Sequence, residues 1–156
     1  MTKISLMFRV YLSVLIVFLG SCNSKPTVKT VKDYPELNKI IATFFEKYGN
    51  GTPDQAVNYL FETNRDVNIA QLKETRDKLS SVSLLAGIYN GYEIITVQNR
   101  SASLVYYSYL VKHDKQPLRL TFIFYKPKGE WKALRFKFDD EVTTELEQSG
   151  KLYFLQ

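Results

Sequence analysis

The sequence predicts an α+β domain in which N-terminal helices pack on a four-stranded antiparallel sheet. Apolar residues recur at helical spacing up to Gly87, and beyond that glycine the period shortens to two while β-branched and aromatic residues dominate. The 156 residues are 45% hydrophobic and 24% charged, as in ordinary folded proteins. We expect a leader over residues 1–21, a tether over 22–32 and a single domain over 33–156.

The leader has the pattern of a signal peptide. Lys3 and Arg9 are its charged residues, and an apolar run follows over residues 10–19. A ten-residue helix reaches roughly 15 Å, about half the hydrocarbon thickness of a bilayer. The run is therefore too short for a permanent membrane span, and export followed by removal of the leader is expected.

The end of the leader, Leu19-Gly20-Ser21-Cys22, resembles the lipobox of bacterial lipoproteins. Cys22 is the only cysteine, which excludes an internal disulfide, and its thiol is the nucleophile that could accept a diacylglycerol. The resemblance implies cleavage between Ser21 and Cys22 and a lipid anchor in the cell envelope, which we place at the outer membrane facing the periplasm. The alternative is an ordinary secretory signal with an incidental cysteine.

Three helices are predicted before Gly87, over residues 33–49, 52–64 and 68–82. Asp33-Tyr34-Pro35-Glu36 has the composition of a capping box, and Thr52 repeats the cap signal before a proline. The third helix is expected to turn one apolar side inward: Ile69, Leu72, Leu79 and Val82.

Four strands joined by polar turns are predicted next, over residues 88–98, 102–112, 118–126 and 131–138. Alternation places these residues on the face toward the helices: Leu118, Leu120, Phe122 and Phe124 on the third strand, and Leu134, Phe136 and Phe138 on the fourth. A final short helix is expected over 139–148, before a tail over 149–156.

The opposite face of the sheet is expected to be open. It should carry Arg119, Thr121, Ile123 and Tyr125 from the third strand and Trp131, Ala133, Arg135 and Lys137 from the fourth. Tyrosine, tryptophan and arginine are enriched in interface cores. Arg119, Tyr125, Trp131 and Arg135 are therefore the candidate binding residues for a homodimer, an envelope protein or an anionic ligand. The alternative is that Trp131 covers the hydrophobic edge of the strand.

Charge and motifs exclude several functions. Residues 112–137 contain eight basic residues and two acidic ones, Asp114 and Glu130. This excess of positive charge predicts either an anion-binding surface or a solvated face. A net charge of +5 without a strong basic stripe does not favour nucleic acid as a partner. H-E-x-x-H, C-x-x-C and phosphate-loop motifs are absent, and the single histidine, His113, is expected in a solvated turn. No cofactor, metal or catalytic residue is predicted.

Two stretches carry a resemblance to a known fold. Gly87-Ile88-Tyr89-Asn90-Gly91-Tyr92-Glu93 and Trp131-Lys132-Ala133-Leu134-Arg135-Phe136-Lys137-Phe138-Asp139 are similar to the first-strand entry and the last strand of small bacterial lipoproteins with a nuclear transport factor 2-like, or cystatin-like, domain. The resemblance implies a cone-shaped fold with a curved sheet. That fold hosts binding modules as well as isomerases and dehydratases. We therefore expect a non-enzymatic binding module, with a small-molecule enzyme that uses the cone cavity as the alternative.

Overall fold

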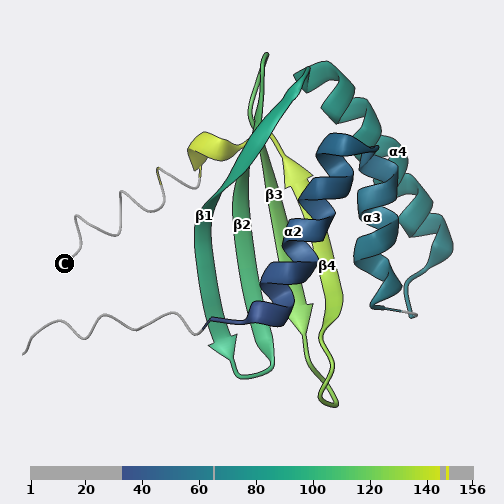
Figure 1. Cartoon of the computed structure of the whole chain (residues 1–156), viewed down its shortest axis with the longest axis vertical. Coiled ribbons are helices and arrows are strands. Elements are labelled where there is room, and N and C mark those ends of the chain that lie inside the picture. The colour runs from purple at the N-terminus through teal and green to yellow at the C-terminus, as the bar shows by residue number, and fades with distance from the viewer. Residues whose placement is uncertain (1–32, 65, 145–146, 148–156) are drawn as a thin grey trace, which may run out of the picture. The chain divides into compact units, whose positions relative to one another are not determined.

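A computed structural model describes residues 33–64, 66–144 and 147 (Figure 1), which all belong to the unit Val31–Gln156. The helices come first: α2 (Pro35–Asn50), α3 (Pro53–Glu62) and α4 (Ile69–Ala86). The strands follow: β1 (Tyr89–Ser101), β2 (Leu104–His113), β3 (Leu118–Tyr125) and β4 (Lys132–Asp139). Each strand pairs antiparallel with the next in the order β1-β2-β3-β4. The predicted α+β class and four-stranded antiparallel sheet are confirmed, and the sheet is curved and unclosed.

Side-chain caps begin two of the helices. The Thr52 side chain accepts a hydrogen bond from the Gln55 backbone N–H, as predicted for α3, and the Asn68 side chain caps α4. The predicted capping box of α2 does not form. Asp33 accepts instead from the Asn38 side-chain amide at 2.6 Å, and α2 begins at Pro35, because proline lacks the N–H that the first helical turn leaves unpaired.

Helix α4 is longer than predicted and continues to Ala86. It ends at Gly87, which has a φ of +94° that side-chain-bearing residues rarely adopt. Leu79 is buried as expected. The inward placement of Ile69 is wrong, since this side chain is 82% exposed; it belongs to the first turn of the helix, while the part of α4 that packs on the core lies further along the chain.

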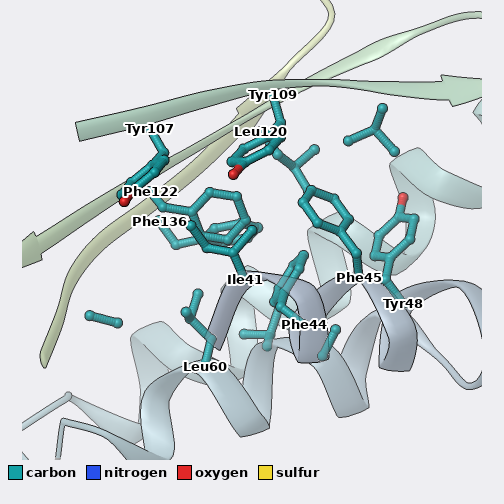
Figure 2. Close-up of a cluster of buried hydrophobic side chains, with 14 of the residues drawn as sticks. Ile41, Phe44, Phe45, Tyr48, Leu60, Tyr107, Tyr109, Leu120, Phe122 and Phe136 are labelled. Carbon is teal, nitrogen blue, oxygen red and sulfur yellow. The ribbon is translucent and has the colours of Figure 1, made fainter. Parts of the chain in front are cut away.

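An aromatic core lies between α2 and the sheet (Figure 2). On β3 the four residues predicted to face the helices are all buried: Leu118, Leu120, Phe122 and Phe124. The Phe44 ring of α2 meets the Phe122 ring edge-on, with centroids 5.0 Å apart. This geometry is favoured for aromatic pairs and fixes the helix against the middle of the sheet.

A β-bulge at Leu134 changes the faces of β4. Phe124 pairs with Ala133 and Ile123 with Arg135, which leaves Leu134 as an extra residue. Leu134 is 53% exposed while Ala133 and Phe136 are buried. The inward prediction for Leu134 is therefore wrong, and so is the outward prediction for Ala133, because strict alternation fails across a bulge.

Several predictions concern residues that the structure does not describe. The leader, the tether, Ser21, Cys22 and the tail over 149–156 lie outside the described residues. Within the predicted final helix, residues 142–144 and 147 are helical. Asp139 ends β4 rather than starting that helix. None of the helices in the described part is long and apolar enough to cross a membrane.

Candidate functional site: a groove along β4

Two hollows, of about 910 and 420 Å³, lie between β4 and the helices. Both are lined by Gln71 and Thr75 of α4 and by Phe136 of β4, so they lie next to each other along the same strand. The larger hollow extends to the loop after α3 and to Tyr125 at the end of β3. We call the two adjacent hollows together the β4 groove.

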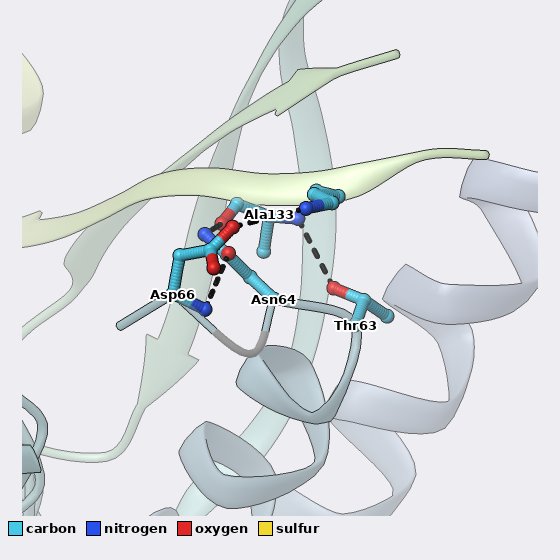
Figure 3. Close-up of polar contacts among 5 residues, drawn as sticks. Thr63, Asn64, Asp66 and Ala133 are labelled. Atoms are coloured by element: carbon cyan, nitrogen blue, oxygen red, sulfur yellow. Dashed lines mark hydrogen bonds and ion pairs between the residues drawn. The ribbon is translucent and has the colours of Figure 1, made fainter. Parts of the chain in front are cut away.

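Hydrogen bonds join the end of α3 to one residue of β4, Ala133 (Figure 3). The Ala133 N–H donates to the Thr63 hydroxyl at 3.1 Å, and the Asn64 side-chain amide donates to the Ala133 carbonyl at 3.0 Å. The loop beyond α3 is fixed by Asp66, whose N–H donates to the Asn64 side chain and whose carboxylate pairs with Lys132. Both backbone groups of Ala133 therefore point toward the helices and away from β3.

Beyond this contact, no strand of the described residues pairs with the outer edge of β4. Hydrogen-bonded and non-bonded pairs alternate along an antiparallel ladder. Because Ala133 points away from β3, so do the backbone groups of Phe136 and Phe138, which pair with Phe122 and Leu120. In the described part of the chain, no other group forms a hydrogen bond with the N–H or carbonyl of Phe136 or Phe138. The groove thus contains unpaired strand-edge groups beside α4.

The groove has an excess of positive charge once the residues that form ion pairs with each other are set aside. Lys132 pairs with Asp66 at 3.1 Å, and Lys78 of α4 pairs with Glu74 at 2.6 Å. Among the described residues, these lining cations have no carboxylate partner: Lys128, Arg135 and Lys137. Glu130 is the lining carboxylate without a cation within the same described residues. The site is therefore suited to a negatively charged ligand.

The four predicted binding residues do not form one surface. Tyr125, which is 41% exposed, and Arg135 both line the β4 groove. Arg119 lies on the sheet face opposite the helices as expected, but two of its nitrogens donate to the Asp139 carboxylate at 2.9 Å each. The Arg119 guanidinium, which could otherwise bind a carboxylate of a ligand in this two-bond geometry, is therefore already bound to Asp139.

The placement of Trp131 on the open face is wrong. Its side chain is 7% exposed and meets the Tyr34 ring edge-on at 5.2 Å. The Lys126 ammonium lies 5.4 Å from the centre of its ring. The bulge at Leu134 exchanges the two faces of the strand for the residues before it. Trp131 and Ala133 therefore lie on the core side and not on the open face. This matches the alternative in which Trp131 covers a hydrophobic edge.

His113 is also not in a solvated turn. It ends β2, half-buried, and its Nε2 lies 3.2 Å from the Tyr48 hydroxyl, which also bonds to Ser83. Burial lowers the pKa of His113 against the opposing effects of the Val111 backbone and of Asp114, and burial raises the pKa of Tyr48. This cluster joins α2, α4 and β2, which sequence patterns could not reveal because its members are far apart in the chain.

Comparison with known proteins assigns no family. No protein-family model matches the chain, and none of the curated proteins compared with it gives a match either. Within the residues that the structure describes, no cluster of three or more histidine, cysteine or acidic side chains could hold a metal ion.

Proposed function

We propose that this chain is a bacterial lipoprotein, anchored through acylated Cys22 at the outer membrane facing the periplasm. Its domain is a cystatin-like, or nuclear transport factor 2-like, cone that serves as a protein-binding module. The lipobox-like Leu19-Gly20-Ser21-Cys22 supports the anchor. The order of helices before a curved antiparallel meander supports the fold assignment.

The β4 groove is the observation that carries the binding role. It combines an exposed tyrosine and leucine with cations and edge-strand backbone groups that have no partner among the described residues. Aromatic residues and arginine are enriched in protein interfaces. An enzyme needs an ionisable group that faces a substrate, whereas Tyr48 and His113 are bonded to each other within the aromatic core.

Cys22→Ser tests the anchor. The substitution removes the only acylation site, so the protein should move from the membrane pellet to the soluble fraction after cell disruption. Mass spectrometry of the wild-type N-terminus should find a diacylglyceryl Cys22. A mature N-terminus at another residue, or an unmodified Cys22, contradicts the lipoprotein assignment.

Site-specific photo-crosslinking tests the groove. A photoreactive phenylalanine analogue at Gln71, which lines the groove, should form a covalent adduct with a partner protein in the envelope. The same analogue at Lys73, which is exposed on the same helix, should not form it. The purified partner must then bind the wild type and lose at least tenfold affinity for Gln71→Trp but not for Lys73→Trp. Equal adducts from both positions refute the groove as the binding site.

A further inference from the structure

We infer that the β4 groove binds an extended, acidic peptide segment of a partner protein, which adds to the sheet as a fifth strand along β4. This inference rests on the proposed function and specifies its ligand. Four backbone groups, the N–H and carbonyl of Phe136 and Phe138, face the groove without partners in the described chain. Peptides recognised by strand addition gain affinity from this kind of main-chain pairing.

The dimensions of the groove suit one strand. Residues 135–139 of β4 span about 16 Å at the rise of an extended chain. The hollow of about 420 Å³ lies along Phe136, Lys137, Phe138 and Asp139. The hollow of about 910 Å³ adjoins it at Arg135 and Phe136. The Thr63 and Asn64 contacts with Ala133 block pairing at the start of β4. An added strand would therefore begin beyond Ala133 and continue toward Asp139, with α4 along its other side.

The side chains of β4 specify the sequence pattern of the peptide. Arg135 and Lys137 line the groove at the edge of β4, where they alternate with the buried Phe136, so their exposed side chains leave the strand on the side away from the core. Within the described residues no carboxylate pairs with either of them. Cross-strand neighbours of opposite charge stabilise a sheet, so acidic residues of the peptide should lie beside them. Alternate peptide residues would lie on the side of Phe136 and Leu72 and should be apolar. The expected ligand alternates acidic and apolar residues.

A synthetic peptide tests the inference with the full-length chain in detergent micelles. The probe is fluorescein-labelled Glu-Val-Glu-Val-Glu-Val, and anisotropy measures its Kd. We expect saturable binding that weakens at least tenfold for Arg135→Glu with Lys137→Glu and for Gln71→Trp. The matched controls, Lys39→Glu with Lys115→Glu and Lys73→Trp, should bind within twofold of the wild type. Circular dichroism confirms that each variant is folded.

Two modified probes separate strand addition from simple charge attraction. A peptide with N-methylated backbone amides keeps its charges but loses its donors, and it should bind at least tenfold more weakly. A Lys-Val-Lys-Val-Lys-Val peptide should not bind. Equal binding of the N-methylated peptide overturns strand addition while leaving a binding groove in place.

The remaining outcomes also decide. One outcome is that the Glu-Val-Glu-Val-Glu-Val peptide fails to bind while the crosslinked partner still loses affinity for Gln71→Trp. In that case the ligand class is wrong and the proposed function stands. If the wild type forms a dimer in sedimentation that Gln71→Trp abolishes, the occupant is a second copy of this chain and the peptide inference is refuted. If no groove variant affects the partner, the proposed function itself fails.

Discussion

Replacing Phe44 by alanine tests the aromatic core on which the arrangement of α2 and the sheet depends. Phe44 is fully buried, and its ring is within aromatic contact distance of four others, among them Phe122 at 5.0 Å and Phe136 at 5.4 Å. The truncation removes the ring from the centre of this cluster. Rigid neighbours on both α2 and β3 cannot collapse fully into the space.

The expected cost follows from these contacts. A buried phenylalanine truncated to alanine costs about 3–5 kcal/mol, and each lost edge-on pair belongs to that total rather than adding to it. With a urea dependence of about 2 kcal/mol per molar, the unfolding midpoint should fall by about 1.5–2.5 M. Such a loss is a large share of the roughly 5–15 kcal/mol that stabilises a typical domain.

Urea unfolding followed by circular dichroism measures this effect. Leu84→Ala is the control, because Leu84 is 79% exposed on α4 and its truncation should change the free energy of unfolding by less than about 0.5 kcal/mol. A double-mutant cycle with Phe122→Leu should give a coupling of about 0.5–1.5 kcal/mol for the edge-on pair. A Phe44→Ala midpoint within 0.5 M of the wild type, at an unchanged slope, would refute the assignment of the core.

Three further perturbations have defined outcomes. Gly87→Ala should lower stability by about 1–3 kcal/mol in thermal unfolding, because the new Cβ would lie 1.8 Å from the Asp114 carboxylate oxygen at a φ of +94°; an unchanged melting temperature contradicts this. Burial lowers the pKa of His113 in the folded state despite the neighbouring Asp114, so the unfolded state takes up its proton first and stability should decline as the pH falls below about 6.5; His113→Asn should remove that part of the decline, and a parallel pH profile for the variant would show that another group causes it. Thr63→Ala removes the acceptor of the Ala133 N–H and should cost about 1 kcal/mol, with faster hydrogen exchange at that amide; exchange at the wild-type rate would mean that the bond contributes nothing.

Local signals in the sequence predicted the elements, while contacts between distant segments determined the site. The alternation of β3 and the Thr52 cap depend on neighbouring residues, and both are found as predicted. The bulge at Leu134 depends on how β4 meets both β3 and the end of α3, through hydrogen bonds that join residues 69 and 70 positions apart. A period-two pattern contains no information about such contacts. The same reason accounts for Trp131, whose burial follows from the phase that the bulge imposes.

The position of Arg135 shows what remains accessible to sequence reasoning. Strand alternation predicts it on an exposed face with Tyr125, and both side chains are exposed and line the groove. Their exposure follows from strand alternation within one hairpin. The groove itself also requires α4, whose Gln71 has no distinguishing pattern in the sequence. Its role is set by tertiary packing alone.

The order of the elements also has a consequence for biosynthesis. The ribosome completes α2 long before the strands that cover it, and the bond between Tyr48 and His113 joins residues 65 positions apart. An isolated helix of 16 residues is marginally stable in water. A nascent chain that ends before Leu118 therefore lacks the Phe122 and Phe136 rings that cover Phe44. Once β3 and β4 emerge, each strand can pair with its neighbour in the chain, and resistance to proteolysis should arise late and in a single step.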